Sequence, residues 1–448
     1  MKVPLSGTTS CFGSKATMPQ FAAVEKRWSF VNFPIPFDHP YTLPTLVVTV
    51  SASSLLYYYL QASHTAELRE AVRLRDIHNR RYSKRPEDRY ASLKVERRFV
   101  NPFSEWREVR WWETVLFWLC RWKGNGVPSS HEMLEKALPL KRPALDKIFT
   151  KEELIQSWVD VKDQSRKRPD ISFTWLGQST CLITMDGLTI LTDPSFSARS
   201  VNQYIGPKRL RPLPCSLEEI RSEIDVVLVS HDHFDHLDSQ VVKQLGNSVT
   251  WYIPLGLRDW FMRRGVENVV ELDWWQEIHH KEQPEIVFAC VPAMHWSGSR
   301  TLFDKNGSLW CSYVIKSRND RIFFCGDTGY SHGLFKAIGE LYAPFSLAAI
   351  PIGSFAPESL MKHLHMSPAD AVRAHYDLRS PRVSVGIHWG TFMMSNEHYA
   401  DPPRLLKLAW EQARDKPSSS SDNRTDEDSR FITTPLGETI FLHAEGHA

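Results

Sequence analysis

The sequence has few cysteines, and they form no recognisable pairs. Its seven cysteines are scattered along the chain, and no CxxC motif brings two of them together. Disulfide frameworks and zinc ribbons are therefore not expected. Several cysteines lie in apolar runs, such as Cys290 in EIVFAC and Cys325 in RIFFCG, where cysteine acts as a small hydrophobic residue. We predict reduced thiols in a non-oxidising compartment.

An excess of charge of either sign is also lacking. The formal net charge is +2, from 54 Lys and Arg against 52 Asp and Glu. The C-terminal two thirds contain no basic stretch interleaved with aromatic residues, so we expect no nucleic-acid partner. No repeat of about 20–50 residues occurs, which argues against a solenoid. With 448 residues the chain can bury one large core or two modest ones.

A long apolar segment lies near the N-terminus. Residues 41–62, YTLPTLVVTVSASSLLYYYLQA, contain no charged side chain, and a segment of this length can span a bilayer. Residues 1–40 are rich in Ser, Thr, Pro and Phe, which is typical of a disordered or targeting segment. We predict a transmembrane helix over 41–62, with a buried core helix as the alternative.

The next region, residues 63–165, is basic and rich in tryptophan. Between residues 63 and 100, eleven Lys and Arg stand against six Asp and Glu. Such a flank attracts anionic lipid headgroups and holds its side of a membrane segment in the cytosol or matrix. WREVRWWETVLFWLCRW, residues 106–122, mixes Trp and Arg as interfacial helices do. We predict a membrane-proximal helical region; the alternatives are a solvated charged helix and a helix packed on the main domain.

Residues 166–448 change to short apolar runs separated by Gly, Pro and Asp, with helical patterns between several of them. One such pattern, SPADAVRAHYDL, places Ser367 at an N-cap, Pro368 in the first turn and Asp370 at the N3 position. Many strands and fewer helices predict sheets packed face to face with helices outside. Residues 415–430 are polar and predict a disordered insertion. The predicted strands are ISFTWLG, CLITMDG, LTILTDP, IDVVLVS, TWYIPLG, EIVFACVP, SLWCSYVI, RIFFCGD, LAAIPIG and RVSVGIHWG.

Four potential metal ligands follow directly on the apolar run at residues 226–229. They are His231, His233, Asp235 and His236, in the stretch HDHFDH. Burying polar groups costs free energy unless they have partners, so four of them directly behind a buried strand indicate a bound partner. Histidine and carboxylate are ligands that Zn²⁺ prefers. Neighbouring side chains point apart, so the four can serve two adjacent ions, His231 with His233 and Asp235 with His236.

Three further candidates each follow another apolar strand. His295 comes after VFACVPAM, Asp327 after RIFFCG and His388 after RVSVGI. One histidine can complete each ion and Asp327 can bridge both. Two ions held in this way activate water and stabilise the oxygens of a displacement at phosphorus. A lone histidine is more often a satisfied core residue, but the full constellation predicts a dinuclear site.

Longer motifs accompany these residues over roughly residues 97–412. They are TWLGQST, LTDPSFSARS, YIGPKRLRPLPC, HDHFDHLD, VPAMHWS, FFCGDTGYS, HMSPADAVRAHYDL and IHWGTFMMSNEHYADPP. The seven candidate ligands resemble the signature of the metallo-β-lactamase superfamily, and the longer motifs resemble its N-acyl-phosphatidylethanolamine-hydrolysing phospholipase D family. The resemblance implies an α+β fold, the four-layer αββα sandwich, here with an N-terminal membrane-associated helical extension. It also implies hydrolysis of N-acyl-phosphatidylethanolamine to N-acylethanolamine and phosphatidic acid, two Zn²⁺ per chain and a homodimer.

The resemblance further implies a role for each site residue. One zinc would be held by His231, His233 and His295, the other by Asp235, His236 and His388, with Asp327 as the bridge. Asp235 and Asp327 would also be catalytic. His365 matches a histidine near the catalytic centre and would bind the phosphate or give a proton to the leaving alkoxide. Phe234, where the family can carry tyrosine, would contact substrate.

A phospholipid and a membrane surface are the expected partners. The expected location is a mitochondrial membrane or the cytosolic face of an endomembrane, with a single membrane pass. One alternative keeps the fold and the metals but changes the substrate to a lactone or a nucleic-acid phosphodiester. Another is a membrane protein that organises lipids with little turnover.

Overall fold

The computed structural model describes residues 39–120, 125–149, 171–201, 204–298, 300–301, 304–415 and 428–443. The chain divides into two units, residues 1–66 and 67–448. Nearly all of the predicted targeting segment 1–40 and most of the predicted insertion 415–430 lie outside the described residues. The six cysteines within them are free thiols, as predicted.

The predicted apolar helix is present and is longer than its apolar sequence. Helix α1, Thr42–Arg80, continues from the uncharged segment into the basic region. It is long and apolar enough to cross a membrane, and none of its most apolar stretch is buried. The membrane-spanning role stays a prediction. In the second unit, the guanidinium of Arg73 is buried and donates to the backbone carbonyls of Asn101, at 3.3 Å, and Phe103, at 2.7 Å.

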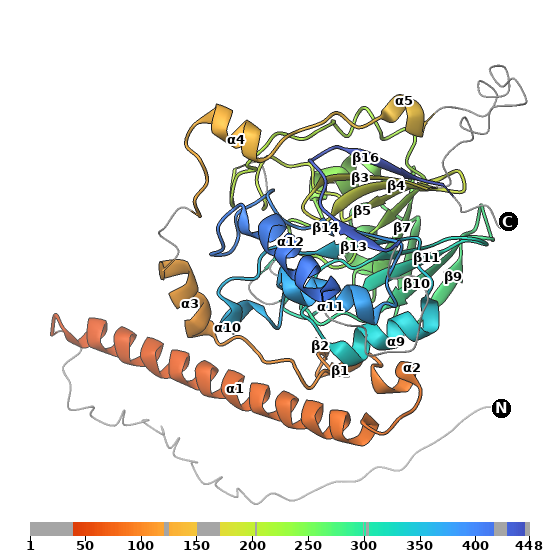
Figure 1. Cartoon of the computed structure of the whole chain (residues 1–448). Coiled ribbons are helices and arrows are strands. Elements are labelled where there is room, and N and C mark those ends of the chain that lie inside the picture. The colour runs from red at the N-terminus through yellow and green to blue at the C-terminus, as the bar shows by residue number, and fades with distance from the viewer. Residues whose placement is uncertain are drawn as a thin grey trace, which may run out of the picture. The chain divides into compact units, whose positions relative to one another are not determined.

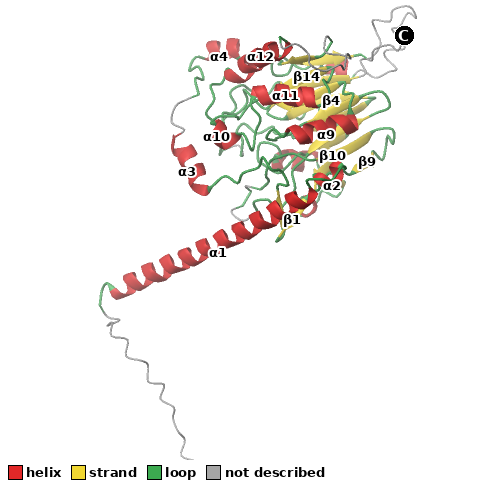
Figure 2. Cartoon of the chain, turned by 60° about the horizontal axis from the view of Figure 1, so that its bottom comes forward, coloured by secondary structure: helices red, strands yellow, loops and turns green. Residues whose placement is uncertain are grey.

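Short elements follow α1 before the sandwich begins. They are α2 (Pro86–Arg89), the hairpin of β1 (Leu93–Val95) and β2 (Arg98–Val100), α3 (Trp111–Cys120), α4 (His131–Ala137) and α5 (Leu145–Ile148). Helix α3 is the Trp-rich helix expected within 106–122. Large apolar side chains on it, Trp112, Leu116, Trp118 and Leu119, are more than 40% exposed. It lies beside α10 (Glu358–Met361) in both views (Figures 1 and 2).

Two mixed sheets of seven strands each form the body of the second unit (Figure 1). Each sheet has an antiparallel half and a parallel half. In spatial order the first contains β16 (Thr439–Leu442), β3 (Ile171–Gly177), β4 (Thr180–Met185), β5 (Leu188–Thr192), β6 (Val226–Leu228), β7 (Thr250–Pro254) and β8 (Val269–Leu272). The second contains β15 (Arg430–Ile432), β14 (Val383–Ile387), β13 (Leu347–Pro351), β12 (Arg321–Phe324), β11 (Ser312–Lys316), β10 (Val287–Val291) and β9 (Glu277–His279).

Helices cover the outer faces of the two sheets. Successive side chains of a strand point to opposite faces, so Ile183 of β4 joins the larger core with the second sheet, while Leu182 joins a smaller outer core. The smaller core contains residues of α7 (Ser239–Leu245) and α8 (Arg258–Met262). The larger core includes residues of α9 (His332–Tyr342), α11 (Pro368–Asp377) and α12 (Asp401–Arg414). The predicted αββα sandwich is confirmed.

Every strand predicted from an apolar run is present, whereas the strands missed are β1 and β2 of the hairpin and the edges of the two seven-stranded sheets. β16 and β8 end the first sheet, and β15 and β9 end the second. Edge strands are short and half-exposed, so backbone pairing holds them and their apolar pattern is weak. The capping box of α11 is confirmed, because Ser367 accepts from the Asp370 amide and the Asp370 side chain accepts from that of Ser367.

A buried histidine should make the sandwich sensitive to acid. His375 on α11 is fully buried between Ser384 and Ser429, at 2.7 and 2.9 Å from their hydroxyls, and burial lowers its pKa to about 3. An unfolded histidine titrates near pH 6.5, so the unfolded chain takes up this proton first and stability falls as the pH drops from 6.5 towards 3.

We expect His375→Gln to reduce the loss of unfolding free energy between pH 7 and pH 5 by about 2 kcal/mol. Urea unfolding followed by tryptophan fluorescence at both pH values measures this difference. The control is His131→Gln, because His131 is exposed on α4. Equal pH slopes in His375→Gln and the unmodified chain would contradict the assignment.

Candidate metal centre

The predicted ligands come from both sheets and meet at one end of the sandwich. His231, His233, Asp235 and His236 lie in the loop after β6, in the first sheet. His295 follows β10, Asp327 follows β12 and His388 follows β14, all in the second sheet. Except for His233, which is partly exposed, these residues are buried. The structure therefore brings together all seven residues that the sequence singled out as ligands.

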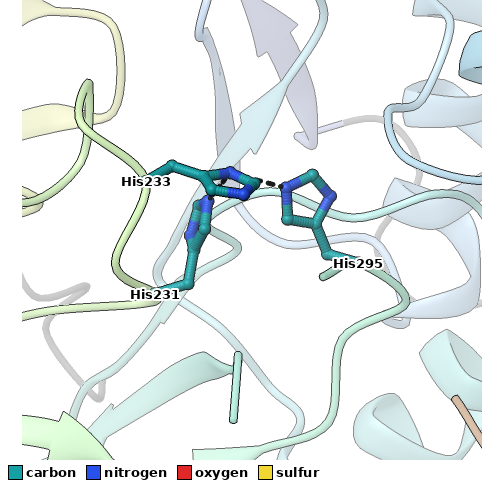
Figure 3. A group of neighbouring side chains, drawn as sticks. All are labelled: His231, His233 and His295. Atoms are coloured by element: carbon teal, nitrogen blue, oxygen red, sulfur yellow. Dashed lines mark hydrogen bonds between the residues drawn. The ribbon is translucent and has the colours of Figure 1, made fainter. Parts of the chain in front are cut away.

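His231, His233 and His295 form the first group, with ligand atoms within 4.8 Å of one another (Figure 3). The Nδ1 atom of His233 is 2.8 Å from His231 Nε2 and 3.3 Å from His295 Nε2. Outer contacts assign the tautomers. His295 Nδ1 donates to the Leu364 carbonyl at 2.8 Å, and His231 Nδ1 donates to the Ser230 hydroxyl at 2.9 Å. Both Nε2 atoms therefore carry lone pairs that face His233.

This arrangement fits a cation. His233 Nδ1 can carry at most one hydrogen, and it faces two lone pairs, so the three nitrogens cannot all be satisfied by each other. Burial lowers the pKa of His233 to about 3 and holds the pKa of His231 and of His295 well below the ordinary value. The rings are therefore neutral near pH 7, which is the form that binds metals.

Asp235, His236 and His388 form the second group, again with ligand atoms within 4.8 Å. His236 Nδ1 donates to Asp193 Oδ2 at 2.7 Å, so its Nε2 faces the group. Burial favours the neutral ring, but the carboxylates of Asp327, Asp235 and Asp193 raise the pKa of His236 well above its ordinary value, and Nε2 gives up its proton when it binds a cation. That Nε2 is buried, has no hydrogen-bond partner among the described residues and lies 3.4 Å from Asp235 Oδ2. His388 Nε2 is 3.7 Å from the same oxygen. A carboxylate beside two histidines is a donor set suited to a borderline divalent metal.

Asp327 stands between the two groups. Its Oδ2 is 3.1 Å from His236 Nε2 and 3.8 Å from His295 Nε2, while its Oδ1 is 3.2 Å from His388 Nε2. Burial opposes its ionisation, but the neighbouring histidines, His236 first, hold the pKa of this carboxyl well below its ordinary range. The oxygens of an ionised Asp327 thus face ligand atoms of both groups, which is the geometry that a bridging ligand requires.

A cavity of about 1000 Å³ opens onto the cluster. Its lining includes Phe234 and His365, the two residues predicted to contact substrate. The His365 Nδ1 atom is buried and, in the part of the chain that the structure describes, has no hydrogen-bond partner; it lies 3.8 Å from Asp327 Oδ2. Burial lowers the pKa of His365 to about 4. The Phe234 ring forms the wall, with the Arg300 guanidinium 5.2 Å from its centroid.

Two buried polar residues that support the ligands were missed from the sequence. Asp193 follows β5 and accepts from His236, from the Ser230 amide and from the Ser230 hydroxyl. Gln178 follows β3 and contacts Asp235 and His388. Both come directly after a predicted apolar strand, in LTILTD and ISFTWLGQ, as Asp327 does. Their position directly after an apolar strand is therefore the sequence signal that could have identified them.

We expect Asp193→Asn to weaken metal binding, because it removes the negative charge that orients and polarises His236. Loss of such an outer partner typically costs about 10–100-fold in metal affinity. Metal per chain after dialysis against a graded chelator series measures the effect. Asp186→Asn, in the exposed turn between β4 and β5, is the control. Unchanged retention in Asp193→Asn would contradict the role of this carboxylate.

Comparison with known proteins agrees with this geometry. The Beta-lactamase superfamily domain matches residues 189–389. A metal-dependent hydrolase of Methanopyrus kandleri is 31% identical over 224 residues, which cover 49% of this chain and 84% of that protein.

Two relatives are similar over most of their length. N-acyl-phosphatidylethanolamine-hydrolysing phospholipase D 1 of Caenorhabditis elegans is 37% identical over 326 residues, covering 70% of this chain and 83% of that protein. The mitochondrial N-acyl-phosphatidylethanolamine-hydrolysing phospholipase D of Saccharomyces cerevisiae is 34% identical over 343 residues, covering 71% and 73%. The chain therefore belongs to the N-acyl-phosphatidylethanolamine-hydrolysing phospholipase D family of metal-dependent hydrolases.

Proposed function

We propose that this chain hydrolyses the phosphodiester of N-acyl-phosphatidylethanolamine at a membrane surface, releasing N-acylethanolamine and phosphatidic acid. The observation that carries the proposal is the cavity beside the ligand cluster, because its walls are apolar apart from the cluster and a few polar groups. A lipid places one charged phosphodiester beside long apolar chains, and the cavity presents the matching pair of surfaces.

The side chains of the cavity wall are mostly apolar, which suits an acyl chain. Trp106, Phe117, Trp118, Leu360 and Met361 are among its lining residues. Outside the ligand cluster, the described lining carries the charges of Glu108 and Lys305, and these two pair with each other at 2.8 Å. A chain of methylene groups gains about 0.8 kcal/mol for each CH₂ it buries, so such a wall favours a lipid over a nucleotide or a small lactone.

Two Zn²⁺ ions per chain are the proposed cofactor. The donor set is nitrogen and carboxylate oxygen without thiolate, which suits Zn²⁺. Of the four overlapping groups of described residues that could hold an ion, the group of His231, His233 and His295 and the group of Asp235, His236 and His388 share no residue, and Asp327 lies close to both. When bound, the ions lower the pKa of water and neutralise phosphate charge. Asp235 and Asp327 supply negative charge that holds them.

His365 and Phe234 are assigned to the substrate. His365 lies at the cavity wall beside Asp327, and its buried Nδ1 has no hydrogen-bond partner within the described ranges. That nitrogen is placed to hydrogen-bond a phosphate oxygen or the leaving oxygen. Phe234 supplies an apolar surface beside His233 and Asp235, without the hydroxyl that a tyrosine would add.

Membrane association is proposed for delivery of the lipid. Helix α1 satisfies the length and composition of a single pass, and α3 exposes Trp and Leu side chains while Phe117 and Trp118 line the cavity. The yeast relative is named mitochondrial, which supports a mitochondrial membrane over the cytosolic face of an endomembrane. A homodimer remains an expectation from the family resemblance.

Product analysis tests the reaction. N-acyl-phosphatidylethanolamine and plain phosphatidylethanolamine are supplied side by side, and the water-insoluble products are identified by mass spectrometry. We expect N-acylethanolamine and phosphatidic acid from the first lipid, and loss of kcat/KM by about 100-fold or more in Asp327→Asn. Asp186→Asn is the control. Full activity and normal metal content in Asp327→Asn would contradict the two-metal reaction, and turnover of neither lipid would contradict the substrate.

Deletion of residues 1–62 tests the membrane role. We expect the truncated protein to leave the membrane fraction after a salt wash, and to hydrolyse detergent-dispersed lipid as the full chain does. The double variant Leu55→Asp, Leu56→Asp keeps the chain length and should leave the membrane fraction as the truncated protein does. The reason is that one Asp at the centre of a membrane helix costs about 3 kcal/mol on insertion. A truncated protein that still pellets fully would contradict a spanning α1.

A further inference from the structure

The backbone of Gln178 is fixed at the turn between β3 and β4. Its amide N–H donates to the Thr391 hydroxyl at 2.7 Å, and its carbonyl accepts from the His388 amide at 2.9 Å and from the Trp175 indole at 2.8 Å. Its φ of +51° is uncommon for a residue other than glycine, and its side chain is 1% exposed. The turn therefore delivers this side chain to one defined place.

The side-chain amide of Gln178 lies between two donor atoms of the second ligand group. Its Nε2 donates to Asp235 Oδ2 at 2.6 Å and is 2.7 Å from His388 Nε2. Asp235 comes from the loop after β6 in the first sheet, whereas His388 follows β14 in the second. One amide thus connects ligands that the two sheets carry separately.

A neutral amide has the chemistry needed to hold a metal-binding carboxylate. Asp235 Oδ2 has a second lone pair, so it can keep the hydrogen bond from Gln178 while another lone pair faces an ion. A lysine or arginine at this position would orient Asp235 as well, but its positive charge would oppose a divalent cation. An amide orients the carboxylate without that repulsion.

The first ligand group receives its support elsewhere. His231 is held by Ser230, and His295 by the Leu364 carbonyl and, through its own backbone carbonyl, by the amide of Asn101. The described contacts of the Gln178 side chain are with Asp235 and His388. A change at Gln178 should therefore affect the two groups unequally.

We propose that Gln178 is a positioning residue for the second half-site, Asp235, His236 and His388, and sets the affinity of the ion held there. The inference rests on the two-ion part of the proposed function. A positioning role differs from a merely structural role in one consequence. Loss of the side-chain amide weakens the binding of one ion and leaves the binding of the other unchanged.

Metal titration of the full-length chain tests this inference. Metal-free protein is titrated with Zn²⁺ against a chelating indicator, which gives a dissociation constant for each ion, and with Co²⁺, whose visible absorption reports ligand geometry. The variant is Gln178→Met, which keeps the side-chain length and removes the N–H groups. Gln178→Asn, whose amide is one carbon too short, is the second variant if the first does not fold.

Asp186→Asn is the control, because Asp186 lies in the exposed turn between β4 and β5. We expect Gln178→Met to weaken the binding of one ion by about 10–100-fold and to leave the dissociation constant of the other ion unchanged. The visible spectrum of Co²⁺ bound at the weakened site should also change. Asp186→Asn should leave both constants as they are in the unmodified chain.

The remaining outcomes overturn the inference in distinguishable ways. Two ions in the unmodified chain with unchanged constants in Gln178→Met would show that the amide has no positioning role. An equal loss of affinity for both ions in Gln178→Met would show that Gln178 has a structural role only. Tighter binding in the variant would show that the amide competes with the ion. A single ion in the unmodified chain would overturn the two-ion assignment together with this inference.

Discussion

The structure depends on one electrostatic requirement, which is that several buried lone pairs and carboxylates face each other at the end of the sandwich. His231, His233 and His295 point ring nitrogens at one another, and Asp327 lies against His236 and His388. Hydrogen bonds within the cluster cannot satisfy all of these atoms, because too few hydrogens are available. Divalent cations can accept the lone pairs that remain, and the surrounding hydrogen bonds hold the donor atoms in place for them.

The outer contacts connect this requirement to the rest of the chain. Asp193 and Gln178 fix ligands from within the first sheet, while Asn101 donates to the His295 carbonyl at 2.7 Å from the segment before α3. Arg73, near the end of α1, in turn donates to the carbonyls of Asn101 and Phe103. A continuous set of hydrogen bonds therefore joins the end of α1 in the second unit to the loop that carries a metal ligand.

The predictions made from the sequence succeeded where one local cause decides the structure. Apolar runs between Gly, Pro and Asp gave the central strands, and Ser367 with Asp370 gave the start of α11. The edge strands β8, β9, β15 and β16 were missed, because backbone pairing with a neighbour forms them and their side chains carry little pattern. The end of α1 was also missed, since charged residues after 62 continue the helix that the apolar segment begins.

The sequence by itself determined which residues can bind metal. HDHFDH and the polar residues after three further strands lie behind buried strands, where burying them costs free energy unless a cation pairs with them. The sequence did not determine which atoms face each other. Only the packing of two sheets places His295, Asp327 and His388 around the loop after β6, and only tertiary hydrogen bonds to Nδ1 turn the Nε2 atoms of His231, His236 and His295 towards the cluster. The cavity was likewise decided by tertiary structure, since Phe117, Leu360 and His365 are far apart in sequence and share a wall only because the fold brings their loops and helices together.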